Sequence, residues 1–181
     1  MATLIVMLWV QSGASACACG EPGGIVVAKG QSLYGVPWRI RAKLERSNVF
    51  DSRAVEVHFS IGRKGDYSSA GYFSRLPLPL PPAFVFKATA GEEITDFPES
   101  DITGIAKRRV AWLMVEMGDG DSLTVRPTLA APELLKRFPW LRGLRFFDAF
   151  FPAGQEPRTI TAFDHDGQVL DQLRRHRGAF Q

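Results

Sequence analysis

The chain contains few of the residues that most often carry out chemistry. Among its 181 residues, cysteine occurs only as Cys17 and Cys19, and histidine only as His58, His165 and His176. One residue separates the two cysteines, which is a poor spacing for an ordinary disulfide. No further cysteine or nearby histidine completes a set of zinc ligands. We therefore expect no disulfide framework, no metal site and no cofactor.

Motifs of known reaction chemistry are also missing. The sequence has no Gly-x-Ser-x-Gly elbow, no glycine-rich phosphate loop and no His-Glu-x-x-His motif. A nucleophilic hydrolase needs a serine or cysteine, a base within reach and an acid that orients the base. His58 lies between Glu56 and Ser60 on one face of a predicted strand, where such neighbours stand about 6–7 Å apart, too far for a direct hydrogen bond. We predict a non-enzymatic protein, with a hydrolase whose site lies near His58 or His165 as the alternative.

The first apolar run of the chain is too short to span a bilayer as a helix. It covers the seven residues 4–10, and Ala14 and Ala16 then match the small-residue pattern of a secretory cleavage site. Cys17 follows directly, as in a bacterial lipoprotein, although the segment has no Lys or Arg before the apolar run. We predict an export leader over residues 1–20, of either the signal-peptide or the lipoprotein type. In the second case Cys17 is the lipidation site and the only link to a membrane. The alternative is a cytoplasmic chain whose first apolar run is a strand.

The net positive charge of the chain comes from its C-terminal end. The net charge is +3, and Arg174, Arg175 and Arg177 lie in the last eight residues. The rest of the chain balances 19 basic against 19 acidic residues, with its arginines scattered. Nucleic-acid binding needs basic residues on one face, so we expect no nucleic-acid partner. Residues 176–181 form a basic tail, and the 45% hydrophobic content indicates one globular domain over residues 21–175.

Two β-hairpins dominate the second half of the chain. Residues 109–117 are almost wholly apolar and rich in β-branched and aromatic side chains, which predicts a strand buried on both faces. The sequence Gly-Asp-Gly-Asp at residues 118–121 favours a tight turn into an alternating strand at residues 122–126. A second Asp-Gly turn at residues 164–167 separates residues 159–163 from residues 168–170 and predicts the second hairpin.

A short helix and an aromatic strand connect these hairpins. Residues 132–138 begin with proline and glutamate, place three apolar side chains at helical spacing and end before Pro139. Residues 144–151 then predict a strand, because their large side chains suit both faces of a central strand. One face carries Phe147, Ala149 and Phe151, and the other carries Phe146 and Phe150.

The first half of the chain also alternates with a period of two. Four segments read as strands on this basis: residues 25–28, 37–44, 54–61 and 83–88. Residues 62–69 read as a polar loop, and residues 76–82 as a stiff proline-rich connector or an SH3-type ligand. Roughly nine or ten short strands without a long helix between them predict an all-β fold. We expect an antiparallel β-sandwich with one short helical insertion.

A resemblance to a known group supports this fold. The sequence Gly-Val-Pro-Trp at residues 35–38, alternating strands in the middle, the hairpin of residues 110–125, Arg-Phe-Phe at residues 145–147 and the hairpin of residues 160–170 are similar to uncharacterised actinobacterial proteins. The similarity extends over roughly residues 25–170. It implies an extracytoplasmic, immunoglobulin-like β-domain, and it implies no catalytic residues.

Aromatic side chains are the best candidates for a binding site. Trp140, Phe146 and Phe150 would form a platform for a glycan or a protein partner if one face of their strand were exposed. The competing interpretation is that these rings belong to the core of the domain. Two acidic turns resemble calcium loops, but the position at which an EF-type loop needs glutamate is Arg175, so that loop type fails. The alternative is that these turns and the acidic segment of residues 92–101, which holds five acids, converge on a hard cation, although ordinary turn chemistry explains the loops without a metal.

These observations favour a non-catalytic function. We expect a secreted or envelope-associated interaction domain that binds an unknown protein or glycan partner. The second alternative to this prediction, beside a hydrolase, is a structural or regulatory accessory of an envelope protein. The aromatic platform is expected only if the domain is a binding module.

Overall fold

The computed structural model describes residues 24–47, 52–62, 68–76, 83–89, 99–176 and 179–180. The predicted leader with Cys17, most of the proline-rich segment and most of the acidic segment from residue 92 lie outside these described residues. In the described ranges, no helix combines the length and apolar character needed to cross a membrane.

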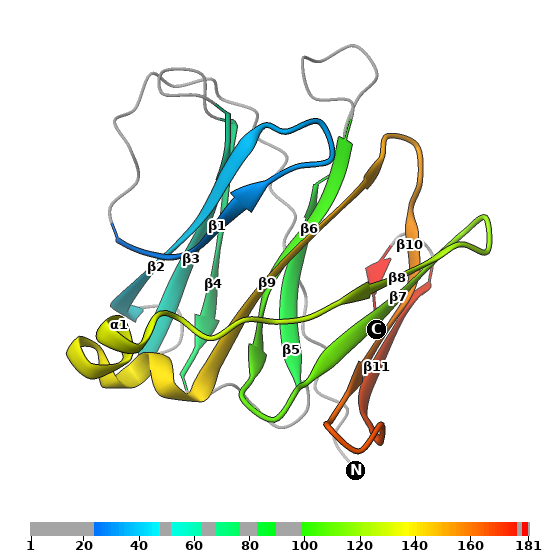
Figure 1. Cartoon of the computed structure of the whole chain (residues 1–181). Coiled ribbons are helices and arrows are strands. Elements are labelled where there is room, and N and C mark those ends of the chain that lie inside the picture. The colour runs from blue at the N-terminus through cyan, green and yellow to red at the C-terminus, as the bar shows by residue number, and fades with distance from the viewer. Residues whose placement is uncertain are drawn as a thin grey trace.

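The described chain forms three antiparallel sheets, and the all-β prediction is confirmed (Figure 1). The first sheet has the order β1-β2-β3-β4, with β1 (Ile25–Gln31), β2 (Pro37–Ser47), β3 (Ser52–Ile61) and β4 (Ser68–Arg75). The second has the order β5-β6-β9, with β5 (Phe84–Thr89), β6 (Glu99–Lys107) and β9 (Leu144–Pro152). The third has the order β12-β11-β10-β7-β8, with β7 (Trp112–Met117), β8 (Ser122–Val125), β10 (Pro157–Phe163), β11 (Val169–His176) and β12 (Ala179–Phe180).

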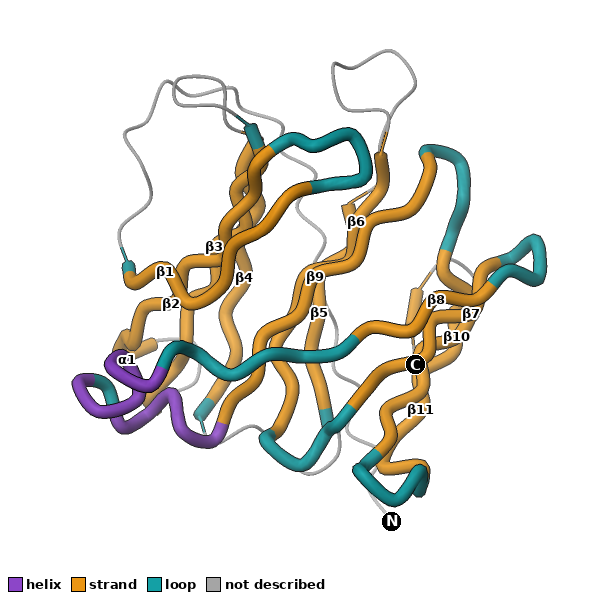
Figure 2. Tube along the Cα trace, viewed as in Figure 1, coloured by secondary structure: helices purple, strands orange, loops and turns teal. Residues whose placement is uncertain are grey.

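The β5-β6-β9 sheet lies between the other two sheets, and each of its faces belongs to a different core (Figure 2). The predicted alternation of β9 is confirmed. Phe147, Ala149 and Phe151 pack into the core shared with the five-stranded sheet, whereas Phe146 and Phe150 pack into the core shared with β1–β4. Two-residue periodicity therefore fixes which core each side chain enters.

The hairpins and the helix occur where the sequence predicts them. Gly120 and Gly167 have positive φ angles of 98° and 78° at the tips of the β7–β8 and β10–β11 turns, a conformation that glycine adopts without strain. The helix α1 (Pro132–Arg137) ends before Pro139, and a 3-10 helix, η1 (Pro139–Gly143), which the sequence did not predict, carries the chain into β9.

Several predicted boundaries are wrong. Strand β7 starts at Trp112, because the N–H of Val110 closes a turn onto the carbonyl of Lys107. It also alternates in burial along its length, so it is buried on one face rather than on both. Strand β4 begins at Ser68, within a segment read as a loop.

Strand β6 is the largest omission. Its first residues belong to the acidic segment, for which no strand was predicted, but the side chains of Glu99 and Asp101 are buried at the start of a central strand. Gly104 lets Phe147 of β9 approach closely, since a Cβ atom there would lie 2.3 Å from Cζ of Phe147. Strand β6 thus combines two features that sequence patterns of strands disfavour, acidic side chains and an internal glycine.

Candidate functional site

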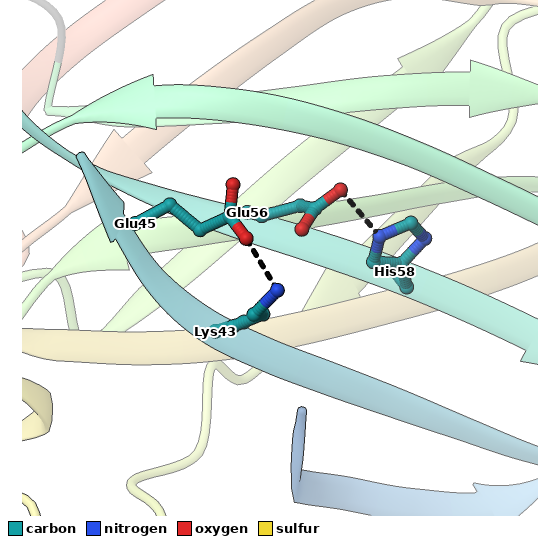
Figure 3. A network of polar contacts seen from close by, with 4 residues as sticks. All are labelled: Lys43, Glu45, Glu56 and His58. Carbon is teal, nitrogen blue, oxygen red and sulfur yellow. Dashed lines mark ion pairs between the residues drawn. The ribbon is translucent and has the colours of Figure 1, made fainter. Parts of the chain in front are cut away.

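The histidine proposed for a hydrolase lies on the polar outer face of the first sheet. Nε2 of His58 is 2.8 Å from Oε1 of Glu56, and Lys43 of β2 forms an ion pair with Glu45 nearby (Figure 3). The expectation that His58 and Glu56 cannot touch is therefore wrong, because the flexible glutamate side chain spans the strand spacing. Ser60 is buried, but its Oγ has no hydrogen-bond partner in the described part of the chain. His58 and Glu56 thus form an imidazole–carboxylate pair, but no hydrogen bond among the described residues connects this pair to the Ser60 hydroxyl.

The second proposed histidine lies in an exposed turn. His165 is at the tip of the β10–β11 hairpin, where Oδ1 of Asp164 accepts hydrogen bonds from the N–H groups of Asp166 and Gln168 at 3.0 and 2.9 Å. This carboxylate closes the turn in the usual Asx manner. No group of three or more metal-ligating side chains gathers anywhere in the described ranges.

The three aromatic residues proposed for a platform are separated by the fold. Phe146 is 1% exposed and faces the first sheet from β9, so its ring belongs to the core and is unavailable to a ligand. Trp140 is half-buried on η1. Phe150 is half-buried between Trp38 and Phe59, with ring centroids 6.3 and 6.1 Å away. Of the three, Phe150 lines the pocket that is described below, and Trp140 and Phe146 do not.

A pair of stacked aromatic rings that was not predicted from the sequence lies on the five-stranded sheet. Trp112 of β7 and Phe163 of β10 are cross-strand neighbours, stacked with centroids 3.8 Å apart and planes 7° from parallel. Both are half-buried, on the face of the five-stranded sheet opposite its core.

The open pocket lies where the three sheets meet. It has a volume of about 320 Å³, at the lower end of the range for small-ligand sites. Its lining comes from the β1–β2 turn at residues 31–33, from β8 and the residue after it at residues 123–126, and from β9 at residues 148–150. The lining includes the half-buried residues Phe150 and Asp148 and the exposed residue Arg126.

A ladder of polar side chains runs from this pocket into the interface between the first and second sheets. Its members are Glu99, Asp101 and Thr103 of β6 and Asp148 of β9, and we call it the acidic ladder. Oγ1 of Thr103 lies 2.7 Å from Oδ1 of Asp148 and 3.1 Å from Oδ2 of Asp101. Cross-strand pairing causes this approach, since Thr103 and Asp148 are directly opposite each other.

The environment of Asp148 keeps its carboxyl group protonated at neutral pH. Burial, and next the nearby charge of Asp101, raise the pKa of Asp148 from its ordinary value of 3.8 to about 8. The hydrogen bond with Thr103 opposes this shift only in part. The Thr103 hydroxyl has one proton, and when it is donated to Oδ1 of Asp148 it stabilises the charged form of that carboxyl group, which is why this bond opposes the shift. Asp148 is therefore a neutral residue of the pocket lining, and its Oδ2 is buried without a hydrogen-bond partner in the described part of the chain.

Glu99 fixes the rim of the pocket. Its carboxylate accepts hydrogen bonds from Oγ of Ser32 at 2.7 Å and from the N–H groups of Leu33 and Tyr34 at 3.3 and 3.4 Å. These bonds hold the β1–β2 turn against β6 while leaving Leu33 and Tyr34 59% and 62% exposed. Two large apolar side chains are thus displayed on an anchored turn.

The sequence contains one signal that marks this site. Glu99, Asp101 and Thr103 alternate with a period of two, and Asp148 interrupts a run of phenylalanines. Polar groups at inward positions of strands are the positions to examine for function. Comparisons of the chain with protein-family models, with curated proteins and with solved structures find no match.

Proposed function

We propose that this protein is a non-catalytic interaction domain, secreted or associated with the cell envelope, that binds a partner at the open pocket beside the β1–β2 turn. The observation that carries the proposal is the pairing of the pocket with an anchored turn that displays Leu33 and Tyr34. Exposed apolar side chains on a rigid turn favour binding, because little conformational entropy is lost when they are covered. Phe150 adds an aromatic surface inside the pocket.

The immunoglobulin-like fold and the cellular location belong to the same proposal. Antiparallel sheets built from strands of two-residue periodicity support an immunoglobulin-like β-domain, similar to the actinobacterial proteins that the sequence resembles. The small-residue pattern before Cys17 favours export, with or without lipidation. Cell fractionation and sequencing of the mature N-terminus test the cellular location. An intact Met1 in the cytosol contradicts both cleavage and lipidation.

Binding is tested by titrating isotope-labelled protein with two defined probe sets, a pool of random dodecapeptides and a pool of cell-wall oligosaccharides. We expect chemical-shift changes in the amides of Leu33, Tyr34 and Phe150. A Leu33→Ser/Tyr34→Ser variant should weaken the response, whereas Leu129→Ser, a substitution of an exposed leucine that does not line the pocket, should leave it unchanged. Shift changes confined to other surfaces would contradict the proposal.

The contact between Glu56 and His58 favours a hydrolase as the second candidate. An imidazole oriented by a carboxylate is the base that such enzymes use. A panel of chromogenic esters and glycosides provides the test. Turnover that is lost in His58→Asn and kept in His165→Asn would replace the binding proposal with this one.

A further inference from the structure

The pocket is an opening that lies where the pairing between the β8 segment and β9 begins and then ends. Thr128, just beyond β8, pairs with Phe146 of β9 through two backbone hydrogen bonds of 2.8 Å. If this antiparallel register continued, Arg126 would lie opposite Asp148, and Thr124 opposite Phe150. In the described part of the chain, β8 and β9 are instead edge strands of different sheets, with no further hydrogen bond between them. The same four residues line the pocket.

The backbone groups at these four positions point into the opening. In an antiparallel pair, the N–H and C=O groups of successive residues point alternately toward and away from the partner strand. Met117 donates its N–H to Asp121, so Leu123 and Val125 of β8 turn their groups toward β7, and Thr124 and Arg126 turn theirs away. On β9 the groups of Phe146 point toward Thr128, away from β6, and those of Asp148 and Phe150 point the same way. Two strand edges therefore border the opening, and their outward donors and acceptors have no partner among the described residues.

The side chains around the opening also differ between its two faces. Leu123, Val125 and Ala149 belong to the apolar side next to the core of the five-stranded sheet. Arg126 and Asp148 line the side that faces the β1–β2 turn. Since the carboxyl group of Asp148 is neutral at pH 7, Arg126 is the charged group that lines the opening. A complementary ligand has its own backbone donors and acceptors, apolar side chains toward one face and an acidic side chain toward the other.

We propose that the opening between β8 and β9 binds an extended peptide segment of a partner protein, which adds itself as a strand to the outward backbone groups of these two edges. The inference rests on the proposed binding function and specifies its ligand. Strand addition takes affinity from main-chain hydrogen bonds and specificity from alternate side chains, as this opening requires. The segment carries an acidic side chain opposite Arg126 and a small apolar side chain on the opposite face.

Selection of dodecapeptides from a random phage-displayed library, followed by synthesis of the best binders, tests the inference. Replacing one amide by an ester removes a single N–H with little change in shape. We expect an ester in the central residues of the peptide to weaken binding by about fivefold, because one hydrogen bond is lost, and an ester at the peptide ends to have no effect. On the protein, Thr124→Pro removes an N–H that points into the opening. Ser122→Pro is the matched control, on the same edge of β8 but outside the pocket lining.

The outcomes separate this inference from the proposed function. Peptides that shift the Thr124, Arg126, Asp148 and Phe150 amides and lose affinity with central esters and with Thr124→Pro would support it. Peptides that tolerate the central esters are held by side chains alone and overturn it. If oligosaccharides shift the pocket amides and no peptide does, the peptide inference is overturned, whereas the proposed binding function still holds. Chemical-shift changes confined to Trp112 and Phe163, or no changes with any probe, contradict both the peptide inference and the proposed binding function.

Discussion

The carboxyl group of Asp148 makes the stability of the fold depend on pH in an unusual direction. Its pKa is about 8 in the folded protein and near 3.8 in the unfolded chain, so between these values the folded state binds the extra proton. Stability is therefore full below about pH 4, falls as pH rises and levels off above about pH 8. For one group, the loss between pH 5 and pH 8 is on the order of 3 kcal/mol.

Asp148→Asn removes this dependence. The carboxamide stays neutral at every pH, and its oxygen can accept the hydrogen bond that Thr103 donates to Oδ1 of Asp148. We expect the free energy of unfolding in urea to be nearly equal at pH 5 and pH 8, and to exceed that of the natural protein at pH 8. Asp166→Asn, in the exposed β10–β11 turn, is the control and should keep the natural slope. If the free energy of unfolding changes with pH in the same way for the natural protein, Asp148→Asn and Asp166→Asn, then Asp148 is not protonated in the folded state.

Thr103 carries two contacts that a similarly buried threonine lacks. Thr103 and Thr161 are both 2% exposed, but Thr103 bridges two carboxyl groups, whereas Thr161 accepts one hydrogen bond from Gln172. Thr103→Val leaves buried polar atoms without partners and should cost about 2–3 kcal/mol, against about 1 kcal/mol for Thr161→Val. Equal losses, measured by urea unfolding at pH 6, would mean that the acidic ladder adds no stability.

At the scale of elements, the contact between β6 and β9 depends on one glycine. A Cβ atom at Gly104 would lie 2.3 Å from the Phe147 ring and 2.4 Å from the carbonyl oxygen of Val85, and this backbone oxygen cannot move aside. Gly104→Ala should therefore destabilise the fold by about 2 kcal/mol or more. Gly118→Ala is the matched control, because its nearest neighbour would be 3.8 Å away. Thermal unfolding of both variants decides the point, and a melting temperature for Gly104→Ala close to that of Gly118→Ala would contradict it.

The elements that the sequence predicted are those whose side chains alternate cleanly. The hairpin turns at Gly120 and Gly167 and the two faces of β9 follow from local rules of backbone geometry and periodicity. Strand β6 was missed because Glu99 and Asp101 are inward-facing acids, and only contacts distant in the chain explain their burial. Ser32 lies 67 residues from Glu99, a separation that no local pattern reveals.

The candidate site was predicted still less well, for the same reason. Phe150 was chosen as a binding residue, but Phe146 was chosen with it, although the fold buries that ring. The opening between β8 and β9 depends on strands that begin one pairing and then join different sheets. Sequence periodicity assigns a residue to a face of a strand, but it does not specify where two strand edges separate.

At the scale of the whole molecule, the β5-β6-β9 sheet should make the two cores unfold together. Ile102 and Ile105 are fully buried on β6, Ile102 in the core with the five-stranded sheet and Ile105 in the core with β1–β4. Because both cores use the same strands, loss of either one removes a face of the shared sheet. We expect Ile102→Ala and Ile105→Ala each to lower the free energy of unfolding by about 2–5 kcal/mol while leaving a single transition.

Tryptophan fluorescence can follow the two halves separately. In variants that keep a single tryptophan, Trp38 reports on the first sheet and Trp112 on the five-stranded sheet. For each isoleucine variant, both reporters should give the same urea midpoint, because a sheet with one uncovered face exposes apolar surface that neither half stabilises alone. Separate midpoints, with Ile105→Ala moving only the Trp38 transition, would show instead that β5, β6 and β9 form a stable unit with the five-stranded sheet, on which β1–β4 pack as an independent layer.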